Sequence, residues 1–367
     1  MTAPRVAYVV ATTAGGTGRH AAMLARGCAE HHQRVSVFGP EACRPLFPDV
    51  PYTAVEIAAR PRPGRDTAAV LRLRRLLARD APGVVHAHGL RAGAVAALAL
   101  AGAPRRPRPA LLVTVHNAAP PGILSGAVYL ALERIVARQA DDVLCVSADL
   151  AGRMRRAGAR DVALAMVPAP PAAEPPAGAV DRARADIGAA GRPVVLAAGR
   201  LAPQKGFDVL LEAVISFRDR DPAPLLVIAG EGPLAGRLAA RSRAAGADVR
   251  FLGPRADVAA LLAAADVVAV PSRWEGQPLI VQETLRAGRP LVASRVGGIP
   301  DLTGEDAAVL VPPDDPARLA AALAAVLDDR ARARALGTAA RARAAALPSE
   351  SDAVTAAQAV YTRLSSP

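Results

Sequence analysis

Short apolar runs alternate with helical patterns along this chain, and the alternation occurs twice, once on each side of a proline-rich stretch. Strands that alternate with helices form a parallel, doubly wound sheet, because each helix carries the chain back to begin the next strand. The sequence therefore predicts an α/β protein with two Rossmann-like domains. Strands are expected at 6–10, 35–38, 84–86, 111–115, 143–146 and 163–167, then at 194–198, 225–229, 249–252, 267–270, 291–293 and 308–311. Helices are expected at 18–30, 66–79, 91–101, 124–139 and 148–157, then at 206–217, 234–244, 256–264, 278–287, 316–327 and 330–346.

The stretch that divides the halves, 167–176, is rich in proline. Proline has no backbone N–H and a fixed φ, so this stretch cannot sustain helix or ladder hydrogen bonds and is expected to be a stiff linker. We predict an N-terminal domain at 1–170, a linker at 171–190 and a C-terminal domain at 191–348, with a last helix at 349–364 packing back on the first domain. Ligands bind beyond the carboxyl ends of such strands, so the two domains are predicted to face each other across one inter-domain cleft.

Positive charge is concentrated in the first half. The formal net charge is +12, of which residues 1–170 carry +11 and residues 171–367 carry +1. A positive face attracts anionic partners by long-range steering. The expected partner is therefore a phosphorylated or other anionic molecule, or the anionic inner face of a membrane. The alternative is a solvated basic surface that serves only solubility. Nucleic acid is disfavoured, because only 3% of the residues are aromatic and no recognised binding module is present.

The remaining composition is typical of a cytoplasmic protein. The longest apolar stretch, 92–103, is shorter than the roughly 20 residues that span a bilayer. The apolar run at 5–10 is too short for a signal peptide and is assigned to the first strand. Cys28, Cys43 and Cys145 have no metal-type spacing and are odd in number, so they are expected to be reduced and buried.

The only lysine of the chain, Lys205, follows a predicted strand in the loop Gly199-Arg200-Leu201-Ala202-Pro203-Gln204-Lys205-Gly206. The other 44 basic residues are arginine. A compact ammonium between a strand end and a helix N-terminus, with an arginine nearby, suits a phosphate or diphosphate. The alternative interpretation is a lone surface lysine.

A second informative segment, 271–290, also follows a predicted strand. Gly276 and Pro278 indicate a turn into a helix, whose first backbone N–H groups would be free to bind a ligand. Glu275 precedes this helix and Glu283 lies on it. Carboxylates accept paired hydroxyl hydrogen bonds, so the pair suits sugar and ribose hydroxyls on either side of a diphosphate. Ordinary helix charges are the alternative.

These motifs, in this order, resemble family 4 of the retaining glycosyltransferases, whose fold is GT-B. The resemblance covers essentially the whole chain and is strongest at 194–301. The family's signature Glu-x7-Glu pair matches Glu275 and Glu283. The other matches in the second half are Gly199-Arg200 with Lys205-Gly206, Ala229-Gly230-Glu231-Gly232-Pro233, Phe251-Leu252-Gly253-Pro254-Arg255 and Gly297-Gly298-Ile299-Pro300-Asp301. The matches in the first half are Gly15-Gly16, His86-Ala87-His88-Gly89 and Thr114-Val115-His116.

The resemblance implies transfer of a hexose from a nucleoside-diphosphate sugar to an acceptor hydroxyl, with retention and without a metal or tightly bound cofactor. A UDP-sugar is favoured as donor, with GDP-mannose as the alternative. The implied catalytic residues are His116, Arg200, Lys205 and Glu275. The implied donor-binding residues are Gly15, Gly16, Arg255, Gly276, Gln277, Leu279, Ile280 and Glu283. The candidate acceptor-binding residues are His20, His88 and Arg91, within the N-terminal, acceptor-binding domain.

Two departures from the family pattern concern the donor sugar more than the fold: Gln277 stands where Phe is common, and Thr284 where Ala is common. The histidines also have structural interpretations. His116 would then be a core residue at a strand end, and His20, His86 and His88 would occupy plain loop or helix positions. Their scattered spacing, without cysteine, does not indicate a metal site.

Three other functions stay open on the sequence. A dinucleotide oxidoreductase would use Gly16-Thr17-Gly18-Arg19-His20-Ala21 and Glu41. That motif is short and leaves the pattern at 194–301 unexplained. A sugar-nucleotide epimerase on the GT-B fold would release a free, altered sugar. A non-catalytic sugar-nucleotide-binding protein would bind the donor without transfer.

Overall fold

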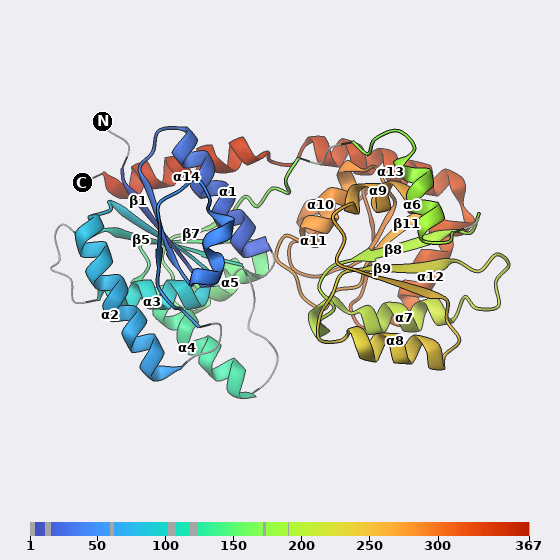
Figure 1. Cartoon of the computed structure of the whole chain (residues 1–367), viewed down its shortest axis with the longest axis horizontal. Coiled ribbons are helices and arrows are strands. Elements are labelled where there is room, and N and C mark those ends of the chain that lie inside the picture. The colour runs from blue at the N-terminus through green and yellow to red at the C-terminus, as the bar shows by residue number, and fades with distance from the viewer. Residues whose placement is uncertain are drawn as a thin grey trace. The chain divides into compact units, whose positions relative to one another are not determined.

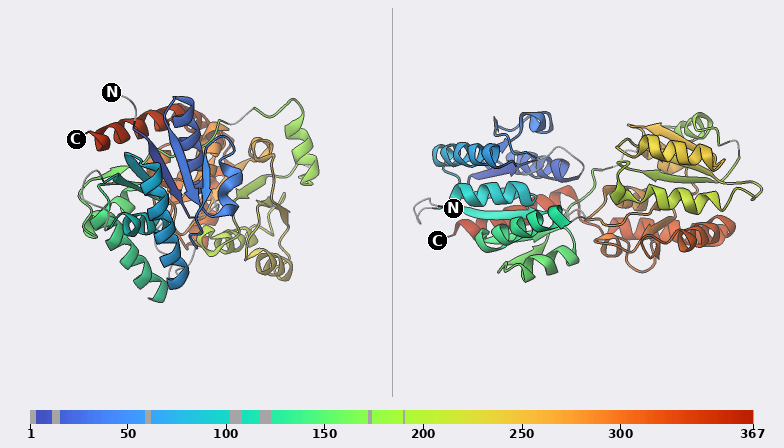
Figure 2. Two further views of the ribbon diagram at one scale, coloured as in Figure 1. Left: turned by 60° about the vertical axis from the view of Figure 1, so that its left-hand side comes forward. Right: turned by 90° about the horizontal axis from the view of Figure 1, so that it is seen from below.

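The computed structural model describes residues 4–11, 16–58, 62–101, 108–116, 123–171, 174–189 and 191–366. The chain divides into two compact units (Figures 1 and 2). The first comprises residues 1–168 and 348–367, and the second comprises residues 169–347. Each unit is an α/β domain built on its own parallel sheet.

The first unit contains a seven-stranded sheet in the order β3-β2-β1-β4-β5-β6-β7. Every pairing in it is parallel. The strands are β1 (Val6–Val10), β2 (Val35–Gly39), β3 (Tyr52–Ala54), β4 (Val84–His88), β5 (Ala110–Val115), β6 (Asp142–Cys145) and β7 (Val162–Leu164). β1 and β4 are buried along their whole length, as expected for central strands of a sheet covered on both faces.

Helices cover both faces of this sheet. They are α1 (Gly16–Glu30), α2 (Pro63–Asp80), α3 (Leu90–Leu100), α4 (Ile123–Gln139), α5 (Ala148–Arg156) and the C-terminal α14 (Glu350–Ser365), with a 3-10 turn η1 (Glu41–Leu46). α1 packs with α14, whereas α3 packs between α2 and α4 (Figure 1). The last helix of the chain thus completes the first domain: buried Val354 and Tyr361 join the same core cluster as Tyr8 and Cys28.

The second unit contains a six-stranded parallel sheet in the order β10-β9-β8-β11-β12-β13. The strands are β8 (Val194–Ala198), β9 (Leu225–Ala229), β10 (Val249–Gly253), β11 (Val267–Val270), β12 (Leu291–Ser294) and β13 (Val309–Val311). The helices are α6 (Ala179–Asp186), α7 (Phe207–Ile215), α8 (Ala235–Ala244), α9 (Val258–Ala264), α10 (Leu279–Arg286), α11 (Ile299–Thr303), α12 (Pro316–Asp328) and α13 (Arg330–Ala345), with a 3-10 turn η2 (Pro203–Lys205).

Two apolar layers sandwich this second sheet. The helices α7 and α12 pack together over one core cluster, which includes Phe207 and Leu323. The helices α6, α9, α10 and α13 pack over the other, which includes Val281 and Leu285. The alternate residues of β8 divide between the two clusters, as the period of a strand requires.

The strands and long helices lie where the sequence predicts them, within a few residues at their ends. The short elements β3, α6 and α11 are not predicted from the sequence pattern. The predicted linker 171–190 contains α6, because buried Ala179 and Ala183 pack this turn of helix against α9. Tertiary packing here overrides a proline- and glycine-rich surrounding that disfavours helix.

Two further predictions concern membrane-spanning helices and the state of the cysteines. Within the described part of the chain, no helix combines the length and the apolar character needed to cross a bilayer. Cys28, Cys43 and Cys145 are all free thiols and all buried, as expected.

Candidate functional site

The loops that follow β8 and β11 meet at neighbouring positions, because these two strands are adjacent in the second sheet. Lys205 lies on the first loop and Glu275 on the second. The Lys205 ammonium donates to the Glu275 carboxylate, with Nζ and Oε1 separated by 2.5 Å. The Ser272 hydroxyl donates to the same oxygen at 2.7 Å. The Glu275 side chain is only 6% exposed, so this carboxylate is held in a fixed orientation.

A small pocket opens beside this pair within the second unit. Its lining includes Ala198, Lys205, Ser272 and Ile280. It therefore lies over the carboxyl ends of β8 and β11 and reaches the first turn of α10. This is where open parallel sheets bind their ligands.

Two glycines with left-handed backbone let the loops approach closely. Gly206 has φ +63°, and a Cβ there would lie 2.0 Å from the carbonyl oxygen of Pro271. Gly297 has φ +52°, and a Cβ there would lie 1.8 Å from the carbonyl oxygen of Glu275. Both distances are far inside van der Waals contact, so only glycine fits. The sequence pattern places glycine at both positions, and the structure supplies the reason.

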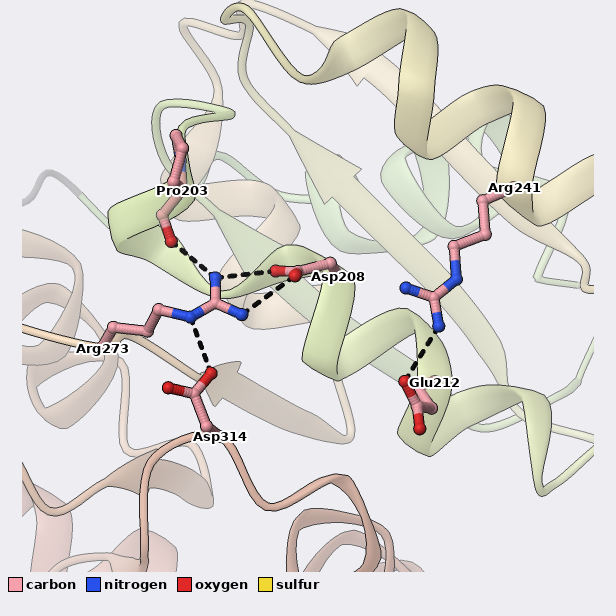
Figure 3. Close-up of polar contacts among 6 residues, drawn as sticks. All are labelled: Pro203, Asp208, Glu212, Arg241, Arg273 and Asp314. Carbon is pink, nitrogen blue, oxygen red and sulfur yellow. Dashed lines mark hydrogen bonds and ion pairs between the residues drawn. The ribbon is translucent and has the colours of Figure 1, made fainter. Parts of the chain in front are cut away.

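Arg273, on the loop after β11, also connects this loop to the loop after β8 (Figure 3). Its guanidinium donates twice to the Asp208 carboxylate at 2.9 Å, once to the Pro203 carbonyl at 2.7 Å and once to Asp314 at 2.6 Å. The backbone N–H of Arg273 also donates to the carbonyl of Gln204 at 2.8 Å. Burial, the largest single influence, would raise the pKa of Asp208. The hydrogen bonds and charge of Arg273, with hydrogen bonds from the backbone of Asp208 and Val209, together outweigh burial and lower the pKa. The sequence does not identify this arginine as special, because nothing in the pattern distinguishes it from the many surface arginines.

Replacing Arg273 with methionine is expected to lower the free energy of unfolding by about 2–3 kcal/mol, since several hydrogen bonds to charged groups are lost. The matched control is Arg241→Met, which removes an arginine that donates at 2.9 Å to Glu212 on the same unit, where both side chains are largely exposed (Figure 3). An exposed pair contributes at most about 1 kcal/mol. Urea denaturation measures both variants; equal losses would show that Arg273 is not a structural tie.

The two predicted arginines of the second unit, Arg200 and Arg255, are both exposed but differ in their ion pairing. Arg200 is exposed. Arg255 is exposed and forms a two-pronged ion pair with Asp257, at 2.7 and 2.6 Å. This pairing lowers the pKa of Asp257. A ligand would therefore have to compete with Asp257 for the Arg255 guanidinium, whereas Arg200 extends from the loop that carries Lys205.

The helix α10 begins at Leu279, directly after Gly276, Gln277 and the N-cap residue Pro278. Leu279, Ile280 and Glu283 are half-buried, whereas the intervening Gln282 is buried. Thr284, unusual at its position, is fully buried and donates its hydroxyl to the Ile280 carbonyl at 2.6 Å. Its polar atom is thus satisfied within the helix.

In the first unit, three histidines converge at one edge of the sheet. His20 lies on α1, which follows β1; His88 ends β4; and His116 follows β5. β1, β4 and β5 are neighbours, so their carboxyl ends meet. All three rings are buried, and His88 Nδ1 lies 3.2 Å from His116 Nε2. The sequence interpretation of His88 as a loop or helix residue is therefore wrong, because it is the last residue of a central strand.

His86, two residues earlier on β4, has a different set of partners. Its Nδ1 lies 2.7 Å from the Tyr361 hydroxyl of α14, and its Nε2 lies 2.7 Å from the Thr114 hydroxyl. Tyr361 in turn lies 2.7 Å from the hydroxyl of Tyr8. This buried network of hydrogen bonds connects the C-terminal helix α14 to β4 and β5. It reaches β5 at Thr114, two residues before His116. His86 too is a strand residue, which agrees with the strand predicted at 84–86 and excludes the alternative loop or helix position.

Burial makes all four rings poor bases. It lowers the pKa of His20 to about 4, although the hydrogen bond to Met166 opposes this. It lowers the pKa of His86 to about 3. For His88 and His116, burial and then the neighbouring histidines lower the pKa well below its ordinary value. The imidazoles are therefore neutral near pH 7 and can act as hydrogen-bonding groups or ligands.

Stability is expected to fall as the pH drops below about 6.5. The unfolded chain protonates these histidines near that pH, whereas the folded chain takes up the protons only near pH 3–4 for His20 and His86. The unfolded state thus binds more protons in this window, and each ring contributes a loss of about 2 kcal/mol between pH 7.5 and pH 5. Urea denaturation at the two pH values measures the loss, and His86→Gln should reduce it. A flat profile would contradict the buried, neutral state.

Of the other residues predicted for the first unit, Arg91 is engaged away from the histidine cluster. Arg91 donates to Asp66 at 2.6 Å and to the Ala58 carbonyl at 3.1 Å, so its charge is already paired between α2 and α3. Gly15 lies outside the described residues. Gly16, which is described, begins α1.

Comparison with known proteins agrees with this architecture. Residues 15–170 match the family model described as Glycosyl transferase 4-like domain, and residues 192–329 match the one described as Glycosyl transferases group 1. D-inositol 3-phosphate glycosyltransferase of Corynebacterium efficiens is 40% identical over 163 residues, which are 41% of this chain and 38% of that protein. The counterpart in Salinispora tropica is 36% identical over 178 residues, 41% of this chain and 36% of that protein. The matched region thus spans about two fifths of the length of these curated relatives.

Solved structures share the fold along nearly the whole chain. HepE of Anabaena in complex with UDP-glucose has a TM-score of 0.82 at 20% identity, covering 99% of this chain and 100% of that one. Sucrose-phosphate synthase of Thermosynechococcus elongatus has a TM-score of 0.81 at 22% identity, covering 98% and 99%. With two Rossmann-like sheets and both family models in their expected order, this chain belongs to the group 1 glycosyl transferases, family 4, of GT-B fold.

Proposed function

We propose that this protein is a retaining hexosyltransferase that moves a sugar from a nucleoside diphosphate to an acceptor hydroxyl without a metal ion. The observation that carries the proposal is the Lys205–Glu275 pair. It joins the loops after β8 and β11 beside a pocket, with the carboxylate further held by Ser272. A cation and an oriented carboxylate at this edge suit the two ends of a sugar diphosphate.

The chemistry assigned to these residues is mostly electrostatic. Arg200 and Lys205 neutralise charge that develops on the departing diphosphate, so no metal ion is needed there. Glu275 holds the donor sugar hydroxyls, together with the backbone amides of Gly276–Ile280. Glu283 binds the ribose, and Arg255 lies on the loop assigned to the nucleotide base.

His116 is assigned to the donor sugar, where a neutral imidazole hydrogen-bonds a hydroxyl or steadies the oxocarbenium-like transition state. No residue of the sequence motifs stands out as a covalent nucleophile, in contrast to the paired carboxylates of retaining glycosidases. We therefore assign same-face attack: the acceptor hydroxyl forms the new glycosidic bond as the bond to the diphosphate breaks. The leaving phosphate accepts the acceptor's proton.

A UDP-sugar is the proposed donor, with GDP-mannose as the alternative. HepE, which shares the fold, is described in complex with UDP, with UDP and glucose, and with UDP-glucose. The proposed acceptor is anionic. The curated relatives are named for D-inositol 3-phosphate, and the first half of this chain carries nearly all of the net positive charge.

A donor panel tests the proposal. Calorimetry with UDP-glucose, UDP-N-acetylglucosamine, GDP-mannose and NAD is expected to show selective binding of one sugar nucleotide, lost in Lys205→Met. Binding should persist in EDTA. Binding of NAD alone would contradict the proposal and favour the oxidoreductase interpretation through Gly16 and Glu41.

Product analysis separates transfer from the two remaining alternatives. With the bound donor and a set of anionic acceptors, a transferase yields a glycoside and a nucleoside diphosphate in equal amounts. An epimerase on the same fold yields a free, altered sugar without an acceptor. Binding with neither product would identify a non-catalytic sugar-nucleotide-binding protein.

A further inference from the structure

The rings of His20, His88 and His116 form a compact cluster inside the first unit. Each ring offers one nitrogen, and the three nitrogens lie within 4.8 Å of one another. The ring centres are 5.3 to 5.6 Å apart. His20 Nδ1 is buried and has no hydrogen-bond partner among the described residues. Buried polar atoms without a partner are rare and call for a ligand or water.

The contacts of His20 determine which of its nitrogens is free. Its Nε2 lies 3.0 Å from the backbone carbonyl of Met166, and a carbonyl can only accept a hydrogen bond. Nε2 therefore carries the proton, and Nδ1 carries the lone pair. A ring that donates one N–H to a carbonyl while its other nitrogen is free has the arrangement of a metal-ligating histidine.

The spacing of the other two rings is also compatible with one ion. His88 Nδ1 and His116 Nε2 are 3.2 Å apart. Two nitrogens at that separation, each about 2.05 Å from a shared ion, subtend an angle of about 100°, close to tetrahedral. Burial also keeps the rings unprotonated near neutral pH, which leaves their lone pairs available.

We propose that His20, His88 and His116 bind one Zn²⁺ ion, with the fourth position taken by water or an anionic oxygen. Three neutral imidazoles and an open position form a known zinc environment. The ion is an inhibitor rather than a cofactor. It coordinates the His116 ring, which is assigned to the donor sugar, and it places two positive charges where the reaction develops positive charge. This inhibitory effect rests on the proposed function, whereas the binding itself does not.

Metal titration of the purified protein, freed of metal beforehand, tests the binding without any assay of activity. Calorimetry with ZnCl₂ is expected to show one site per chain. Addition of CoCl₂ is expected to give the intense visible absorption of tetrahedral Co²⁺. His20→Gln and His88→Gln should each weaken binding by at least about tenfold, because a neutral amide replaces an imidazole ligand.

The matched control is the double variant His31→Gln, His32→Gln, which removes two exposed histidines of the same unit. It should bind Zn²⁺ as the wild type does. Circular dichroism and melting without metal establish that each variant is folded. X-ray absorption of the wild-type zinc complex gives an independent result, with three imidazole nitrogens expected.

Several results would overturn the site: no binding by the wild type at one ion per chain, octahedral cobalt, fewer than three imidazoles, or full binding by folded His20→Gln. Loss of binding in the His31, His32 control would assign the metal to the surface. If Zn²⁺ binds as predicted but donor binding and turnover are unaffected, the metal site stands and the assignment of His116 to the donor sugar fails.

Discussion

Lys205→Met is expected to lower kcat/KM about a hundredfold to a thousandfold, the usual loss when one preorganised charge-stabilising group is removed. The variant keeps the length of the side chain but removes the ammonium that would neutralise the leaving diphosphate. Glu275→Gln should lower kcat/KM to a similar degree, because an amide accepts sugar hydroxyl hydrogen bonds more weakly than a carboxylate. Initial rates at a range of donor concentrations measure both.

Folding must be separated from chemistry in this test. Lys205→Met by itself leaves the Glu275 carboxylate 6% exposed, with the Ser272 hydroxyl still donating to Oε1. Breaking such a partly buried pair destabilises by up to about 3 kcal/mol. The double variant Lys205→Met, Glu275→Gln removes both charges, so it should regain most of that stability and yet stay inactive.

The matched control for activity is Arg241→Met, which also removes one positive charge from the second unit and should turn over normally. A double variant with normal stability and near wild-type turnover would contradict the assignment of both residues. A double variant that is inactive and poorly folded would instead show that the pair is structural.

Gly297→Ala is expected to have the second large effect. The added Cβ would lie 1.8 Å from the Glu275 carbonyl oxygen, so the loop that carries Glu275 has to move. Destabilisation by more than about 3 kcal/mol is expected, or else a folded protein with at least a tenfold weaker donor affinity. Thermal melting and donor calorimetry together measure the two results.

Gly246→Ala separates steric conflict from backbone strain. Gly246 has φ +62°, similar to the φ of Gly297, but a Cβ there would meet nothing within 4 Å. Its substitution should lower stability only by the ordinary left-handed penalty of about 1–2 kcal/mol and leave donor affinity unchanged. Equal effects of the two substitutions would show that the contact with Glu275 has no role of its own.

The central strands and long helices of both domains could be predicted, because each has a clear hydrophobic pattern in its own sequence. The sequence places β8, β9 and β11 at the bounds that the structure has, since continuous apolar runs of Val, Leu, Ile and Ala indicate buried parallel strands. β3 was missed because it has only three residues, all half-buried. The helix α6 was missed because its stability comes from packing on α9 rather than from its sequence.

The candidate site also contains residues that could be predicted from the sequence and residues that could not. Lys205, Glu275 and Gly297 could be selected from the sequence, because each belongs to a motif whose residue types suit a sugar diphosphate, and their roles remain predictions. Arg273 and Ser272 could not be selected, because serine and arginine acquire a role only from the partner they contact. The pairing of Lys205 directly with Glu275 is likewise a tertiary fact.

Periodicity and motif chemistry are local properties, so the sequence is enough to predict the two doubly wound domains, the family and the candidate donor-binding residues. The cluster of His20, His88 and His116 could not be predicted in this way, since residues far apart in sequence meet where β1, β4 and β5 end side by side. The folded structure also shows how the last helix, which is predicted from the sequence to pack back on the first domain, is held there: the Tyr361 hydroxyl contacts His86. Sheet order and burial, which bring distant groups together and fix their protonation, are set by the packing of the whole chain.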